Sequence, residues 1–371
     1  MAAVAAGIKK GGVLDLSMIY SDRSATAAAV FTQNTFIAAP LIVTKKNLQN
    51  SGHVARAVIV NSGNANAATG EPGIQAAQAT ADALAAAIEC RPDEVIVSST
   101  GVIGRPLPLV KIREAIPNLV AGLLPANLEL LARGIMTTDT VPKIAATEVS
   151  GVRIAGVAKG AGMIHPDMAT MLAFIMTDAA LPYDELDEAL RYAVHRSFNS
   201  ISVDGDTSTN DMVVVLANGA SGNRPTPQSF RDGLMDVCTQ LATAIVRDGE
   251  GATKFVQIDI EGAPSESAAH TIGRAIARSP LVKTAIYGAD PNWGRIVGAV
   301  GNSGVPLKSD RVDIYISGVP ISDSTLEQAR QKLREKEIQI RVVLHSGSAS
   351  ARVWTCDLTE GYIRINADYT T

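Results

Sequence analysis

Residues 159–172 read KGAGMIHPDMATML, and their order suggests how the fold is built around them. A glycine pair leads to Pro166, and Ala169-Thr170 stands directly before the apolar run MLAFIM at 171–176. A short apolar run bounded by turn residues is consistent with a buried strand. The stretch therefore predicts a loop that opens, at Thr170, into a strand inside a sheet.

Thr170 at such a junction is a candidate nucleophile. Its hydroxyl could attack the preceding carbonyl and form an ester, and hydrolysis would then leave Thr170 as a new N-terminus. An α-amino group titrates near roughly 7.7–8.0, so it can serve as the base that a threonine hydroxyl needs. The same residues also fit an ordinary β-branched residue that opens a strand, and the pattern alone leaves both interpretations open.

Helical and strand patterns alternate around this stretch. Apolar runs predict strands at 56–61, 94–99 and 213–219, and 3.6-residue periodicity predicts helices at 73–90, 183–198 and 228–247. Further along, period-two alternation predicts an antiparallel sheet with one helix near 322–336, its strands lying at 255–262, 312–318, 339–347 and 351–358. We expect a mixed α/β (α+β) fold with a core domain at 1–255 and a smaller α+β domain at 256–371.

The composition excludes several classes of protein. The 371 residues carry a net charge of −4 and only 4% aromatic residues, which disfavours nucleic-acid and membrane-surface binding. Three scattered cysteines and the lack of CxxC or HxxxH spacing disfavour a disulfide scaffold and a metal site. No apolar run approaches 18 residues. We expect a cytoplasmic protein that acts on small molecules.

The acidic segment SVDGDTSTND at 202–211 allows two interpretations. It fails as a calcium loop, because Thr209 and Val215 stand where glycine and glutamate are needed. Asp204 or Asp206 could instead serve as a phosphorylated nucleophile in a magnesium-dependent phosphatase. We favour a turn rich in Asx residues, which hydrogen-bond their own backbone.

Ordered blocks along essentially the whole chain resemble the ornithine acetyltransferase family of arginine biosynthesis. Beside KGAGMIHPDMATML and SVDGDTSTND, they are VAAGIKKGGVLDLSMIYSD (4–22), VIVNSGNANAATG (58–70), VIVSSTGVIG (95–104), GIMTTDTVPK (134–143), RDGEGATK (247–254), YGADPNWGRI (287–296) and INADYTT (365–371). The resemblance implies a layered helix–sheet fold similar to the N-terminal-nucleophile-like aminopeptidases of the DmpA type.

The resemblance also implies roles for individual residues. Cleavage would fall between Ala169 and Thr170, with Thr170 as nucleophile and with Thr100 and Gly101 stabilising the oxyanion. The substrate contacts that it implies are Thr137, Lys159, Thr170, Glu250, Asn366 and Thr371, the last two on a C-terminal tail that reaches the active site. His165 falls at a variable position of the family, so we interpret it as a loop residue.

The implied reaction moves an acetyl group from N2-acetyl-L-ornithine to L-glutamate through an acetyl-Thr170 intermediate. It needs no metal or cofactor, although acetyl-CoA is a possible second donor. The family suggests a heterotetramer of two N-terminal (1–169) and two C-terminal (170–371) chains. The alternatives are an N-terminal-threonine aminopeptidase or amidohydrolase, the phosphatase, and a non-catalytic binding protein.

Overall fold

The computed structural model describes residues 1–165, 171–308 and 311–368. The chain forms two compact units, and each is described by itself. Unit 1 contains Met1–Gly160, Pro166–Asn199 and Thr207–Ala242, and unit 2 contains Ala161–His165, Ser200–Asp206 and Thr243–Thr371. The domain boundary near residue 255 stays a prediction.

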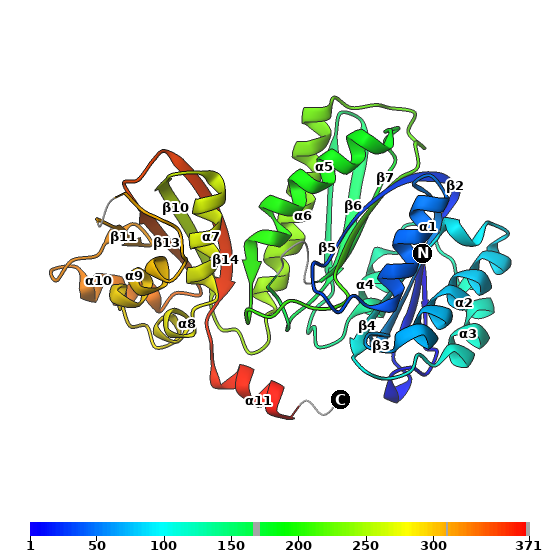
Figure 1. The fold of residues 1–371 in the computed structure, drawn as a ribbon, viewed down its shortest axis with the longest axis horizontal. Coiled ribbons are helices and arrows are strands. Elements are labelled where there is room, and N and C mark those ends of the chain that lie inside the picture. Colours follow the sequence, from blue (N-terminus) through cyan, green and yellow to red (C-terminus); the bar gives the residue numbers. More distant parts are fainter. Residues whose placement is uncertain (166–170, 309–310, 369–371) are drawn as a thin grey trace. The chain divides into compact units, whose positions relative to one another are not determined.

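Unit 1 is built on an eight-stranded mixed sheet with the order β4-β3-β2-β9-β7-β6-β5, and β1 pairs with β2 at its side (Figure 1). The β3–β4 and β7–β9 pairs are parallel, and the other pairs are antiparallel. The strands are β1 (Ala2–Val4), β2 (Leu16–Phe31), β3 (Val54–Asn64), β4 (Val95–Val102), β5 (Lys143–Val149), β6 (Val152–Lys159), β7 (Leu172–Thr177) and β9 (Met212–Ala217).

Helices cover both faces of this sheet because its central strands are apolar on both sides. Along β3, Val58 and Val60 join one buried cluster while Ala57 and Ile59 join another, as the two-residue period of a strand requires. Helices α2 and α3 pack on the Ala57 face, and α4 packs on the Val58 face. The helices of unit 1 are α1 (Ala39–Asn50), α2 (Gly70–Ile88), α3 (Leu109–Ala121), α4 (Leu128–Ile135), α5 (Tyr183–Arg196) and α6 (Pro227–Arg247, whose last turn belongs to unit 2), with short 3-10 turns η1 (Lys10–Gly12), η2 (Pro92–Glu94) and η3 (Phe198–Ser200, whose last residue belongs to unit 2).

Unit 2 holds a six-stranded sheet with the order β12-β11-β13-β10-β14-β8. Its strands are β8 (Ile201–Ser202), β10 (Phe255–Ala263), β11 (Asp313–Ile316), β12 (Val319–Pro320), β13 (Glu337–Val343) and β14 (Ala349–Cys356), and its helices are α7 (Glu266–Ala277), α8 (Pro280–Tyr287), α9 (Trp293–Gly301), α10 (Leu326–Leu333) and α11 (Glu360–Asp368). Helix α7 contributes Ala269, Ile272 and Ile276 to the core over this sheet.

Two expectations for the last third of the chain are wrong. The sheet is not purely antiparallel, since β10–β13 and β8–β14 are parallel pairs. Parallel pairing needs a long crossover, and α7 to α10 lie between β10 and β13 in the chain. The prediction of a single helix near 322–336 also missed α7, α8, α9 and α11, although Ser265 caps α7 by accepting from the Ala268 N–H at 3.1 Å.

The mixed α/β layered architecture is confirmed, as are all the predicted elements of unit 1 to within a few residues. The strand expected after Thr170 is β7, which lies in the middle of the sheet between β6 and β9. None of the helices in the described part of the chain is both long and apolar enough to cross a membrane.

Candidate functional site

Thr100 and Gly101 lie where β4 meets an irregularity in its neighbour β3. The register shifts at Gly63 and Asn64, and Gly101 has a φ of +130°, which favours glycine. A Cβ at Gly101 would overlap the Gly63 backbone and lie 2.5 Å from the Asn64 nitrogen. Only glycine therefore fits at 101, where the register of the β3–β4 pair is irregular although the pairing continues to Val102.

Lys159 brings a positive charge to Thr100. It is the last residue of β6, it is buried, and its Nζ donates to the Thr100 Oγ1 at 3.3 Å. A hydroxyl that accepts from an ammonium still has its own hydrogen to donate to another acceptor. Thr100 and Lys159 are thus brought together by β4 and β6 in a form suited to an anionic reaction centre.

Asp139 connects Thr137 to Lys159. Its Oδ2 accepts from the Thr137 N–H at 3.0 Å, and its Oδ1 accepts from the Gly160 N–H at 2.6 Å and from the Lys143 Nζ at 2.7 Å. Burial alone would raise the pKa of this carboxyl, but Lys159, Lys143 and the Gly160 N–H lower it to about 2. Asp139 is therefore an anion that holds the loop after Thr137 and the end of β6 together.

Asp139 and Lys143 are functional candidates that the sequence interpretation missed. Both belong to the block GIMTTDTVPK, from which only Thr137 was singled out. Lys143 is 2% exposed and Asp139 is 9% exposed. Charged residues are almost never so deeply buried unless paired, and a lone Asp and Lys four residues apart give no sign of burial in the sequence.

Glu250 and Asn366 meet in unit 2. The Asn366 Nδ2 donates to the Glu250 Oε2 at 2.8 Å, and the Glu250 N–H donates to the Ala161 carbonyl at 2.9 Å. A Cβ at Gly162 would overlap the Glu250 carboxylate, so glycine lets this carboxylate lie against the 161–165 segment. The structure thus brings together two of the predicted substrate contacts, Glu250 from the turn after α6 and Asn366 from α11.

Asp204 accepts hydrogen bonds from the same segment, and these contacts support the interpretation of the acidic segment at 202–211 as a turn. Its Oδ2 accepts from the Met163 N–H at 2.6 Å, and its Oδ1 accepts from the Ile164 N–H at 2.8 Å and the Asp206 N–H at 3.2 Å. Burial raises the pKa of Asp204 despite these backbone donors. Both oxygens have a structural use, which favours the Asx turn over a phosphorylated nucleophile.

His165 is locked between two side chains of unit 2. Its Nδ1 lies 3.0 Å from the Ser202 Oγ, and its Nε2 lies 2.8 Å from the Arg274 Nη2. Burial, together with Arg274 and its neighbours, lowers the pKa of His165 to about 3. Since Arg274 can only donate, the Nε2 is the acceptor and the Nδ1 carries the hydrogen. This agrees with a loop residue that holds structure rather than moves protons.

Ala169, Thr170 and Thr371 lie outside the described residues. Among the other predicted site residues, unit 1 carries Thr100, Gly101, Thr137 and Lys159, and unit 2 carries Glu250 and Asn366. The assignment of all these residues as site residues stays a prediction. Within the described ranges, no group of three or more His, Cys, Asp or Glu side chains is arranged to hold a metal ion.

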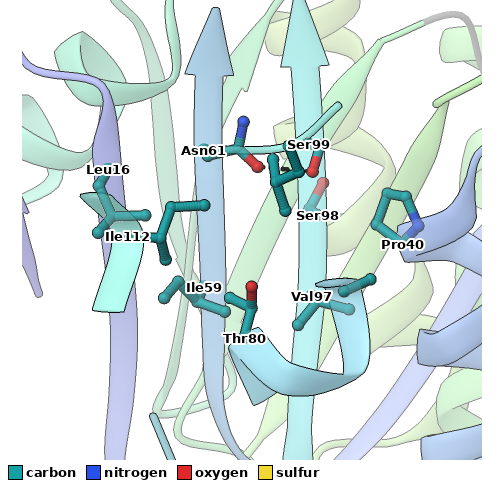
Figure 2. A pocket seen from close by; sticks show the side chains of 11 residues that line it. Leu16, Pro40, Ile59, Asn61, Thr80, Val97, Ser98, Ser99 and Ile112 are labelled. Carbon is teal, nitrogen blue, oxygen red and sulfur yellow. Dashed lines mark hydrogen bonds between the residues drawn. The ribbon is translucent and has the colours of Figure 1, made fainter. Parts of the chain in front are cut away.

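A small cavity in unit 1 lies just before Thr100 on β4. Figure 2 shows Asn61 of β3 and Ser99 of β4 side by side above it, and the Ser99 Oγ donates to the Asn61 Oδ1 at 2.6 Å. The cavity has room for about one water molecule. It is a packing defect between β3, β4 and the helices that cover them, and it is too small to bind an amino acid.

The comparisons with known proteins cover the whole chain. The sequence profile of the ArgJ family matches residues 1–371. Arginine biosynthesis bifunctional protein ArgJ of Thermus thermophilus is 47% identical, with 100% of this chain and 97% of the relative covered. The protein of the same name from Geobacter sulfurreducens is also 47% identical, with 100% and 98% covered.

One solved structure adds a match to a shorter chain. The crystal structure of arginine biosynthesis bifunctional protein ArgJ from Bacillus halodurans is 42% identical with a TM-score of 0.50, and it covers 52% of this chain and 96% of that chain. The family profile and the full-length relatives agree on one assignment. This chain belongs to the ArgJ family.

Proposed function

We propose that this chain transfers the acetyl group of N2-acetyl-L-ornithine to L-glutamate, as an enzyme of arginine biosynthesis. The strongest structural support for the proposal is the contact of the Lys159 ammonium with the Thr100 hydroxyl. The next residue, Gly101, stands where only glycine fits. A hydroxyl and backbone groups fixed beside a buried cation suit the oxyanion of acyl transfer. Membership of the ArgJ family supports the same reaction.

In the proposed mechanism Thr170 is an N-terminal nucleophile. Its Oγ attacks the acetyl carbonyl while its α-amine takes the hydroxyl proton, and Thr100 and Gly101 stabilise the oxyanion. The C–N bond then breaks, the proton passes to the leaving amine, and ornithine departs from an acetyl-Thr170 ester. The amine of glutamate attacks this ester and releases N-acetyl-L-glutamate, so the kinetics should be ping-pong.

The substrate contacts in this proposal follow the chemistry of an amino acid. Lys159 would bind the α-carboxylate that both substrates share, and Thr137 would lie beside it, since Asp139 ties the two segments together. Glu250 would bind the ornithine ammonium, and Asn366 would orient it through the 2.8 Å hydrogen bond. Thr371 would be a further contact.

We further propose that the chain cleaves itself between Ala169 and Thr170 and that the two pieces stay associated. Strands β9 and β7, from the C-terminal piece, lie between β2 and β6 from the N-terminal piece. Separation would break a continuous hydrogen-bonded sheet. The Bacillus halodurans chain supports cleavage too, because nearly all of it matches only about half of this chain. Two such protomers in the cytoplasm would give the heterotetramer.

Denaturing mass spectrometry beside a Thr170→Ala variant tests the proposal. We expect two wild-type pieces of 169 and 202 residues and an intact variant. Acetylornithine should then add one acetyl group to the 202-residue piece alone. A single intact wild-type mass with no acetyl uptake would overturn both the cleavage and the nucleophile.

The second candidate is an amidohydrolase with the same nucleophile, in which water takes the acyl group. Turnover of acetylornithine with and without glutamate separates the two: a transferase releases ornithine continuously only when the acceptor is present. Supplying acetyl-CoA with glutamate would show whether the enzyme also uses the second donor. Turnover of acetylornithine that continues in the presence of EDTA would exclude the magnesium-dependent phosphatase.

A further inference from the structure

Lys9 is presented on a rigid loop close to the Thr100 site of unit 1. The buried Asp15 carboxylate accepts from the Ala6 N–H at 2.6 Å, the Ile8 N–H at 2.6 Å and the Lys9 N–H at 2.8 Å. A fully buried carboxylate with three backbone donors fixes the loop that it binds. The backbone of Lys9 is therefore held in place before any ligand arrives.

The Lys9 side chain lies over the irregular part of the β3–β4 pair, where only glycine fits at position 101. A Cβ at Gly63 would lie 2.6 Å from the Lys9 Cγ, so the lysine stem covers one side of Gly63 while Gly101 packs against it. The Lys9 Nζ then donates to the Met136 carbonyl at 3.1 Å, directly before Thr137. Lys9 thus reaches from Gly63 to the segment that carries a predicted substrate contact.

The charges around Lys9 favour an added anion. Burial lowers the pKa of the Lys9 ammonium, Asp15 and Asp139 raise it, and Lys159 lowers it. Asp139 also lies 2.7 Å from Lys143, so one carboxylate is shared among several cations. An ammonium has three hydrogens to donate, and the Met136 carbonyl takes one of those of Lys9.

We propose that Lys9 is a second cationic contact for the substrate α-carboxylate, which it binds together with Lys159. The inference rests on the proposed acetyl transfer. An α-carboxylate is the one anionic group that N2-acetylornithine and glutamate share, and two ammonium groups that repel each other are stabilised by an anion between them. Lys9 would therefore act in both half-reactions.

The test compares Lys9→Met with Lys10→Met in the self-processed enzyme. The Lys9 change keeps the apolar stem over Gly63 and removes the charge, while Lys10 is an exposed neighbour outside the site. We expect kcat/KM for acetylornithine and for glutamate to fall about 10- to 100-fold in Lys9→Met, mostly through KM, and to stay unchanged in Lys10→Met. Lys9→Arg should recover part of the loss.

A substrate without the carboxylate separates binding from structural damage. N-Acetyl-1,4-diaminobutane is N2-acetylornithine that lacks this group, and Lys9→Met should use it as well as the wild type does. Where its turnover is too slow, inhibition by L-ornithine and by 1,4-diaminobutane gives the same comparison, and Lys9→Met should weaken only L-ornithine.

Three outcomes would be distinct. Equal losses for both kinds of ligand, or Lys9→Met behaving like Lys10→Met, would overturn the role of Lys9 while leaving the proposed function intact. Normal wild-type processing without any acetyl transfer would instead reject the proposed function. Mass spectrometry of the processed pieces confirms that each variant has matured.

Discussion

One buried carboxylate, Asp139, and one half-buried carboxylate, Asp204, organise the two units, and they differ in their surroundings. Asp139 in unit 1 faces the ammonium groups of Lys143 and Lys159, and its pKa is lowered to about 2 although burial opposes this. Asp204 in unit 2 accepts from the backbone N–H groups of Met163 and Ile164, and burial raises its pKa. The cations beside Asp139 thus lower the pKa of its carboxyl, whereas desolvation raises the pKa of the Asp204 carboxyl, whose donors are backbone N–H groups.

The difference also separates two tasks. Asp139 ties Thr137 to the end of β6, where Lys159 stands, and so arranges side chains that we propose to bind substrate. Asp204 holds Met163, whose φ of +54° is uncommon for a residue with a side chain, a few residues before the proposed cleavage site. We therefore interpret both as positioning residues, one for binding and one for the segment that precedes the cut.

The largest effect should come from Asp139→Asn. The variant leaves the Lys143 ammonium buried beside a neutral amide, and removing one partner of a buried pair costs about 3–5 kcal/mol of unfolding free energy. Chemical denaturation followed by circular dichroism measures this. The double variant Asp139→Asn/Lys143→Met should recover much of the loss, and a single variant as stable as the wild type would refute the pairing.

Asp204→Asn should have a smaller effect, about 1–3 kcal/mol, because it weakens hydrogen bonds without leaving a buried cation. We also expect the variant to cleave more slowly between Ala169 and Thr170, measured by mass spectrometry over time. Asp206→Asn, a neighbour that accepts none of these segment contacts, is the matched control. Equal cleavage rates in the two variants would remove Asp204 from this role.

The pH dependence of these two variants should run in opposite directions. The Asp139 pKa is lower in the folded state, so its stabilisation is complete above about pH 4 and disappears as the pH falls towards 2. The Asp204 pKa is raised, so its contribution falls as the pH rises above about 4. The destabilisation by Asp139→Asn should thus shrink in acid, whereas that by Asp204→Asn should grow.

The smallest effect should come from His165→Ala. The imidazole is neutral, with a pKa of about 3, and its two ring nitrogens contact Ser202 and Arg274. We expect a loss of about 1–2 kcal/mol and retained acetyl transfer. Because its pKa is lowered, the loss should be greatest near neutral pH and shrink below about pH 6.5. A processed but inactive variant would contradict this.

Much of unit 1 was predictable from local patterns. The apolar spacing of α2 predicted the buried face that carries Ala77, Ala81 and Leu84, and the run MLAFIM predicted β7. In unit 2 the same reasoning found β10, β11, β13 and β14 but missed the short strands β8 and β12. It did not find the strand directions, because β10 and β13 alternate equally well in parallel and antiparallel pairs.

The sequence by itself determined the family, the candidate nucleophile and the periodic elements, since these depend on residue types and on short spacings. The tertiary structure alone decided that β7 and β9 enter the middle of the sheet, and that Asp139 meets Gly160 while Lys9 meets Met136. These contacts join residues 21 and 127 positions apart. No local period encodes them, because they form only when strands far apart in the chain pair and bury the charged groups between them.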